Sequence, residues 1–268
     1  MIFSNPPLVE LITELRWVPG SPGSPEPKID TQSGVLQFPL MSPHLDETFS
    51  RFANEVAALG FGNSERLIPV GFPYLPFSVV YRYRKPPAQG ENYLYQIGPG
   101  VFSANALPPY RDWDSFRPIV QEGIKALLDS RHPSENGEFT KVTLRYINLF
   151  SEEFTEGRSS FQFMNDVLGI KLLLPETLAQ QSQDFTKIQS GLSLSMPLKA
   201  GVAMSLNLAE GIAAGKSGII MTTEVFSVHP VSPYVQQIAE TLEKAHDSIR
   251  ATFLGLTTNL RAKMGAIQ

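Results

Sequence analysis

Hydrophobic and polar residues alternate near the start of the chain. Over residues 8–18 one face is apolar, and the other face carries Glu10, Glu14 and Arg16. A period of two residues is typical of a half-buried strand. The next segment, 20–34, is rich in Pro, Gly and Ser and predicts a loop.

The rest of the first half predicts a helix, a meander of strands and a second helix. Ser42 is expected to cap the first helix, with Pro43 at its first position and Gly60 at its end. Strands are predicted over 35–40, 66–70, 77–84, 93–97 and 101–105.

Pro118 limits where the second helix, expected over 115–130, can begin. Proline fits comfortably only in the first turn of a helix, so we place the cap at Asp114 or Ser115 rather than at Asp112. Asp112, Trp113 and Asp114 could also bind a sugar or a cation, but helix capping explains them more simply.

The second half repeats the order of the first. Its predicted elements are a strand over 140–150, a short helix over 160–168, strands over 184–196, 202–208 and 218–228, and a helix over 233–264. Apolar residues at a spacing of three and four predict one buried face on this last helix, which Gly255 is placed to bend.

Two similarly patterned halves therefore make up the chain, over 1–135 and 136–268. Their opening strands contain Leu15-Arg16-Trp17 and Leu144-Arg145-Tyr146. We expect an α+β fold in which two strand-helix-antiparallel sheet-helix halves join into one sheet, with the long helices packed on one face.

Composition narrows the class of protein. The 268 residues include no cysteine, which excludes disulfides, thiolate metal sites and cysteine nucleophiles and suggests a reducing cytoplasm. Glu10 and Glu14 interrupt the first apolar run, so neither a signal peptide nor a membrane anchor is expected there. A formal net charge of −4 disfavours unspecific nucleic-acid binding. The candidates for a local basic face are Arg82, Arg84, Lys85, Arg250, Arg261 and Lys263.

Motifs for catalysis and cofactor binding are absent from the sequence. The segment 211–217 has three residues between its glycines where a Walker loop has four, so a hairpin tip is the simpler interpretation. The four histidines, His44, His132, His229 and His246, are scattered, with no second histidine at helical or strand spacing from any of them. We expect no cofactor and no metal, and a polar role on the helix surface for His246.

The most informative polar residues lie on the two opening strands. If these strands are neighbours, Glu10, Glu14, Arg16 and Arg145 form either an ion-pair ladder or a polar site for a ligand or partner. Asn148 lies on the opposite face from Arg145 and needs hydrogen-bond partners if it is buried.

Three segments carry a resemblance to a known family. They are Pro6-Pro7-Leu8-Val9-Glu10 with Glu14-Leu15-Arg16-Trp17, then Leu144-Arg145-Tyr146-Ile147-Asn148, and the closing segment 246–265. The chain resembles, over its full length, a sporadically distributed prokaryotic protein family of unknown function. The resemblance implies a single protein of about this size and assigns no activity.

Three function classes follow from these observations. We expect a soluble, cytoplasmic, non-enzymatic interaction protein with a protein partner, for which a homo-oligomer is one arrangement. The first alternative is a small-molecule binder or an enzyme that uses a cleft between the sheet and the long helix. The second is a nucleic-acid-binding saddle, which needs a contiguous positive surface.

Overall fold

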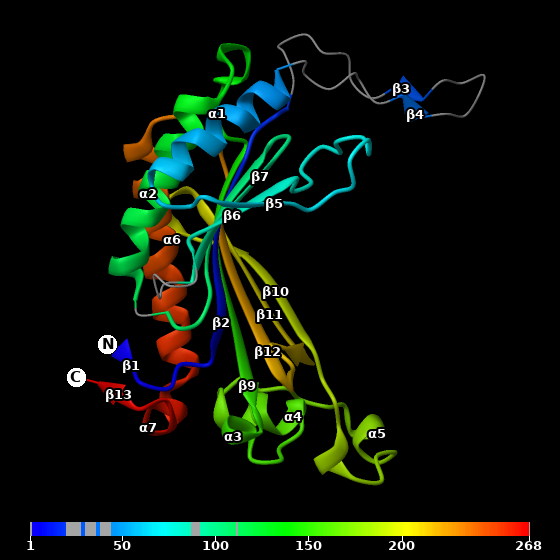
Figure 1. Ribbon diagram of the computed structural model, residues 1–268. Coiled ribbons are helices and arrows are strands. Elements are labelled where there is room, and N and C mark those ends of the chain that lie inside the picture. The colour runs from blue at the N-terminus through cyan, green and yellow to red at the C-terminus, as the bar shows by residue number, and fades with distance from the viewer. Residues whose placement is uncertain are drawn as a thin grey trace. The chain divides into compact units, whose positions relative to one another are not determined.

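A computed structural model describes residues 2–19, 28–29, 36–37, 44–86, 92–110 and 112–267 of the chain (Figure 1). The chain divides into two compact units. Unit 1 comprises Met1–Leu11, Thr143–Val228 and Leu242–Gln268, and unit 2 comprises Ile12–Val142 and His229–Thr241. Three elements run through both: strand β2 (Leu8–Arg16), strand β9 (Lys141–Ser151) and helix α6 (Val235–Leu256).

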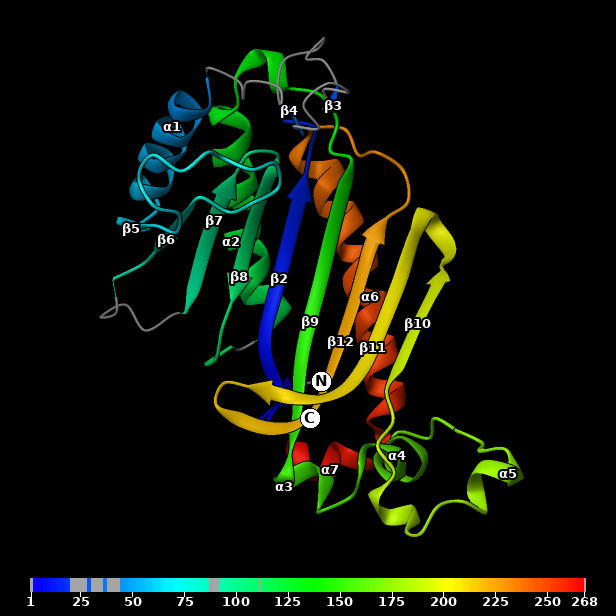
Figure 2. The same cartoon turned by 90° about the vertical axis from the view of Figure 1, so that its right-hand side faces the viewer.

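Unit 1 contains an antiparallel sheet with the strand order β10-β11-β12-β9-β2. Its strands besides β2 are β9 (Lys141–Ser151), β10 (Leu192–Pro197), β11 (Val202–Ala213) and β12 (Lys216–Ser227). Buried and more exposed residues alternate from Val202 to Leu208, so one face of β11 is buried as the period of two predicts. Figure 2 shows α6 behind β11 and β12.

Short helices complete unit 1. They are α3 (Glu152–Thr155), α4 (Ser160–Gln162), α5 (Glu176–Ala179) and α7 (Arg261–Met264). A π-helical turn, Phe163–Val167, follows α4 directly. At the ends of the chain, β1 (Ile2–Phe3) pairs with β13 (Ala266–Ile267).

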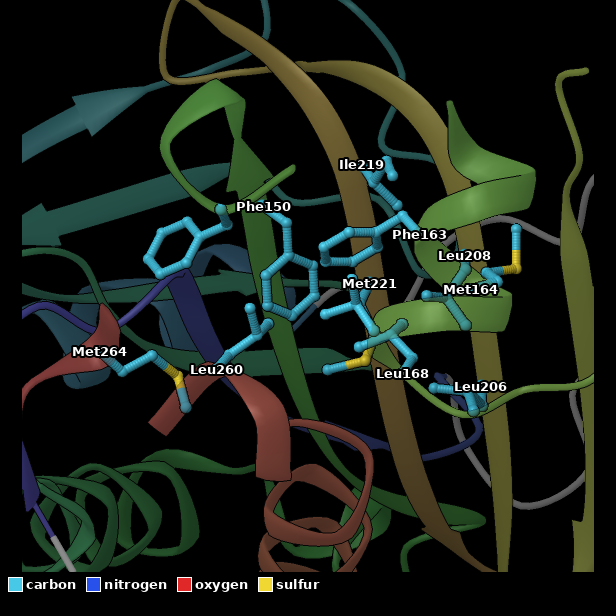
Figure 3. Packing of buried hydrophobic residues seen from close by; sticks show 12 residues of the cluster. Phe150, Phe163, Met164, Leu168, Leu206, Leu208, Ile219, Met221, Leu260 and Met264 are labelled. Carbon is cyan, nitrogen blue, oxygen red and sulfur yellow. The ribbon is translucent and has the colours of Figure 1, made fainter. Parts of the chain in front are cut away.

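The core of unit 1 forms where the π-helical turn and α7 meet the sheet (Figure 3). Twelve buried residues make up this cluster: Phe150, Phe154, Phe163, Met164, Val167, Leu168, Leu206, Leu208, Ile219, Met221, Leu260 and Met264. Apolar residues from five separate stretches of chain therefore leave water together, and this burial is the main favourable contribution to folding.

Unit 2 contains the strand order β2-β8-β7-β6-β5. Its strands besides β2 are β5 (Asn63–Arg66), β6 (Tyr81–Arg84), β7 (Tyr93–Gly98) and β8 (Val101–Ala106). Its main helices are α1 (Leu45–Ala58) and α2 (Trp113–Ser130), and a 3-10 turn follows at Pro133–Glu135. A separate pair of two-residue strands is β3 (Lys28–Ile29) with β4 (Leu36–Gln37).

Helix α2 approaches the sheet of unit 2 closely because Gly123 faces it. A Cβ atom on Gly123 would lie 2.6 Å from the ring of Tyr95 and 2.9 Å from that of Phe102. Phe52 of α1 packs edge-on against Phe102 at 5.7 Å between ring centroids. Aromatic rings at such distances and angles add to the stabilisation from burial.

The α+β class is confirmed, and β2 belongs to the sheet of each unit. The antiparallel meander is confirmed in β7 and β8, as is the strand predicted over 140–150. Gly60 ends α1 with a positive φ of 89°. The halves 1–135 and 136–268 stay a prediction.

Several predicted boundaries are wrong, and a local hydrogen bond explains the start of α2. Helix α2 begins at Trp113, because the Asp112 carboxylate accepts the backbone N–H of Ser115 at 2.8 Å and caps the helix; Pro118 is tolerated further inside. The last helix stops at Leu256, and a 3-10 turn, Thr258–Leu260, separates it from α7.

Other corrections concern strands. Strand β10 begins at Leu192, well after the predicted residue 184. Strands β11 and β12 continue to a two-residue turn of Ala214 and Gly215, both at positive φ, so the predicted tip over 211–217 is mostly strand. Ser42, Pro43 and most of 20–40 lie outside the described residues; α1 begins at Leu45.

Candidate functional site

An uncharged, largely apolar loop joins β5 to β6 in unit 2. We call residues 67–77, with the sequence LIPVGFPYLPF, the apolar loop; it is the cyan loop between β5 and β6 in Figure 1. Four of its large side chains face solvent: Val70 is 87% exposed, Phe72 64%, Leu75 49% and Phe77 42%. Large apolar side chains that gather on one exposed loop are a feature of interaction sites.

Two tight turns give the loop its path. The N–H of Phe72 donates to the carbonyl of Pro69 at 3.2 Å, with Gly71 at a φ of +84° inside this turn. The N–H of Ser78 donates to the carbonyl of Leu75 at 3.1 Å, and Phe77 takes the corresponding positive φ, +62°. Glycine adopts a positive φ freely, whereas phenylalanine does so at a cost that its surroundings must offset.

Tyr74 anchors the middle of the loop to helix α1. Its ring packs edge-on against Phe49 at 5.7 Å, and its hydroxyl donates to the Asp46 carboxylate at 2.8 Å. The guanidinium of Arg66 lies 5.6 Å from the centre of the Tyr74 ring. Burial, together with the Asp46 carboxylate, raises the pKa of the Tyr74 hydroxyl to about 12. The hydroxyl therefore stays protonated and keeps donating to Asp46 throughout the neutral range.

Phe77 anchors the end of the loop to the turn between β7 and β8. Its N–H donates to the carbonyl of Pro99 at 2.7 Å. Gly98 permits this approach, because a Cβ atom there would lie 1.9 Å from the carbonyl oxygen of Ser78. The guanidinium of Arg16 lies 5.7 Å from the centre of the Phe77 ring. Anchored at two points and containing three prolines, the loop presents Phe72 and Val70 in a set conformation.

The predicted charged residues occur in separate ion pairs. Arg16 donates from Nε to Glu14 at 2.7 Å in unit 2. Arg145 donates from Nε to Glu224 at 2.7 Å in unit 1, directly across from it on β12. Glu10 is half-buried on β2. Sequence reasoning missed Glu224, because nothing in the sequence shows that β12 lies beside β9.

We expect Arg145→Ala to lower the free energy of unfolding by about 1–3 kcal/mol, because Glu224 loses a charge-assisted hydrogen bond in a partly buried position. The side chains of Arg145 and Glu224 are 27% and 15% exposed. The double variant Arg145→Ala/Glu224→Ala should lose less than the sum of the two single variants. Urea unfolding followed by circular dichroism measures this coupling, and additive losses would contradict a stabilising ion pair.

Histidines that are far apart in the sequence have close partners in the structure. The rings of His44 and His132 stack in unit 2 with 3.7 Å between centroids. In unit 1, Nδ1 of His246 lies 3.0 Å from the hydroxyl of Tyr146. The predicted polar role of His246 thus has a named partner. Within the described ranges, no group of three or more His, Asp or Glu side chains is placed to hold a metal ion.

Two of the candidate basic residues have acidic partners. Arg82 donates to Glu65 at 3.2 Å in unit 2. Lys263 pairs with Glu156 in unit 1, and this contact, followed by that of Arg158, lowers the pKa of the Glu156 carboxyl to about 2. These pairings weaken the local positive potential that a nucleic-acid surface requires.

No part of the described chain forms a helix with the length and apolarity needed to cross a membrane. Comparisons with family models, curated proteins and solved structures found no match to this chain. The resemblance of its three segments to a prokaryotic family therefore stays a prediction.

Sequence reasoning predicted strands over 66–70 and 77–84, and it did not single out the short connection over 71–76 that they left between them. Strand β5 ends at Arg66 and β6 begins at Tyr81. Pro69, Pro73 and Pro76 were the available signal, since proline donates no ladder hydrogen bond and is rare inside strands. Three prolines within eight residues indicate an ordered loop, even where apolar residues suggest a strand.

Proposed function

We propose that this protein is an interaction protein that binds a partner protein through the apolar loop of unit 2. The exposure of Phe72 and Val70 on an anchored loop carries the proposal. Large apolar side chains that remain in water cost free energy, and a partner that covers them recovers it.

Rigidity and composition both favour binding. The prolines and the contacts of Tyr74 and Phe77 restrict the loop before it binds, so less conformational entropy is lost in the complex. Aromatic residues and arginine are enriched at protein interfaces. Here Arg66 and Arg16 stack on aromatic rings of the loop.

The chemistry of the loop defines the kind of partner. Residues 67–77 carry no charge, so an apolar pocket that accepts an aromatic ring is the complementary surface. Phe72, at the centre of the exposed set, is the expected anchor. The partner is therefore a folded protein with an apolar pocket at its surface.

Phe72→Ser tests the proposal without changing the core. Tagged full-length protein is used to recover partners from a lysate of its own source cells, and each recovered protein is quantified by mass spectrometry. A partner is then purified, and its affinity is measured by calorimetry. Loss of an aromatic anchor should cost about 2 kcal/mol or more, which weakens binding about 30-fold.

Leu173→Ser is the matched control, because Leu173 is 91% exposed in unit 1. It should leave binding unchanged, and both variants should keep the melting temperature of the parent chain. Equal recovery of every partner with Phe72→Ser would refute the proposal. Binding of the parent chain to lipid vesicles, abolished by Phe72→Ser, would replace the protein partner with a membrane surface.

A further inference from the structure

Strand β10 forms an open edge of the sheet in unit 1. It is the last strand on its side, and it pairs with β11 from Leu192↔Leu208 to Pro197↔Ala203 (Figure 2). Five of its six residues are exposed. The backbone groups of β10 that point away from β11 are therefore available to another strand.

The edge of β10 lacks the usual protection against pairing. Natural edge strands carry charges, prolines or bulges that prevent association. Strand β5, the edge strand of unit 2, follows this rule with Glu65 and Arg66 among its four residues. In β10 no residue is charged, and its one proline, Pro197, stands at the end.

The side chains of β10 match themselves under a twofold rotation. Leu192, Leu194 and Met196 alternate with Ser193 and Ser195. Antiparallel pairing of two copies about Leu194 places apolar residues opposite apolar residues and serine opposite serine. A symmetric contact between charged strands places like charges opposite each other, and this pairing avoids that because β10 carries no charge. Leu194 and Met196, 39% and 38% exposed, gain burial from such pairing.

We propose that β10 pairs with β10 of a second copy of this chain and so forms a symmetric dimer. In this dimer Leu194 faces Leu194 of the other copy, Leu192 faces Met196, and Ser193 faces Ser195. The inference uses unit 1 alone and is independent of the apolar loop. Opposed Cα atoms in an antiparallel pair lie about 4.5–5.5 Å apart, a separation that a disulfide can bridge.

Because the chain contains no cysteine, single cysteines map the contact without background. Under mild oxidation Leu194→Cys should form a covalent dimer, and Ser195→Cys alone should form little. A mixture of Ser193→Cys and Ser195→Cys chains should form the mixed dimer. Leu173→Cys, at an exposed site elsewhere in unit 1, measures random collision. Cross-linking of Leu194→Cys no faster than Leu173→Cys overturns the proposed register.

The oligomeric state provides the second test. Sedimentation equilibrium of the parent chain over about 1–100 µM should show a dimer, and Leu194→Lys should shift it to monomer because two lysines would face each other. The exposure of Leu194 makes the substitution compatible with folding, which circular dichroism checks. A monomeric parent chain, or a dimer unaffected by Leu194→Lys, overturns the proposal.

Discussion

Arg131→Ala is expected to destabilise unit 2 by about 3–5 kcal/mol, because it removes one partner from a buried set of charges. Arg131 is 3% exposed, and its guanidinium lies 5.0 Å from the Trp17 ring and 4.8 Å from the Phe139 ring. Burial lowers the pKa of Arg131 to about 10, and the charge of Glu135 opposes this shift. The guanidinium is therefore still charged at neutral pH.

Loss of the guanidinium changes the surroundings of Glu135. That carboxylate is 4% exposed and accepts the indole N–H of Trp17 at 3.3 Å. Without the nearby positive charge, the buried carboxylate loses the attraction that offsets its desolvation. Both rings also lose a nearby cation, at about 0.5–2 kcal/mol for each cation–π contact.

Urea unfolding followed by tryptophan fluorescence measures the loss. The chain has two tryptophans, Trp17 and Trp113, and both lie in unit 2. Arg117→Ala, at an exposed position of α2, the helix that ends just before Arg131, should change stability by less than about 0.5 kcal/mol. Arg131→Met with Glu135→Gln removes both charges and keeps the volume, so it should cost less than Arg131→Ala. If Arg131→Ala lowers the free energy of unfolding by less than about 1 kcal/mol, the charge of Arg131 does not stabilise the buried Glu135 carboxylate.

Periodicity in the sequence predicted elements whose two faces differ. Strand β2 and helix α2 were found because the apolar residues of each gather on one face, and burial on that face is what makes the element stable. Boundaries depend on single hydrogen bonds, such as the one between Asp112 and the N–H of Ser115. These bonds leave no periodic signal, so α2 was predicted to begin two residues late or more.

The candidate site was less accessible to sequence reasoning, for two physical reasons. The partner of Arg145 is decided by strand order, which brings Glu224 beside it from 79 residues away. The apolar loop has the apolar content of a strand, and only its prolines distinguish it. Exposure of Phe72 becomes visible only when the rest of the chain is folded and leaves that ring uncovered.

Phe163→Ala is expected to lower the free energy of unfolding of unit 1 by about 3–5 kcal/mol, as large-to-small changes of buried aromatic residues do. Phe163 is fully buried, and its ring lies 5.2 Å from that of Phe150. The π-helical turn that begins at Phe163 closes with the N–H of Leu168 donating to its carbonyl at 3.1 Å.

The position of Phe163 between the π-helical turn and the sheet explains why its removal should be costly. The turn directs Phe163, Met164 and Leu168 together into the cluster of Figure 3, so a cavity at Phe163 is bordered by both the turn and the sheet. The strands are held in place by their backbone hydrogen bonds and cannot move far into this cavity. The volume left empty therefore adds to the free energy lost when the buried ring is removed. Hydrogen exchange along β11 and β12 should accelerate, whereas Leu173→Ala, at a site 91% exposed, should leave it unchanged. Equal exchange in both variants would contradict a core organised around Phe163.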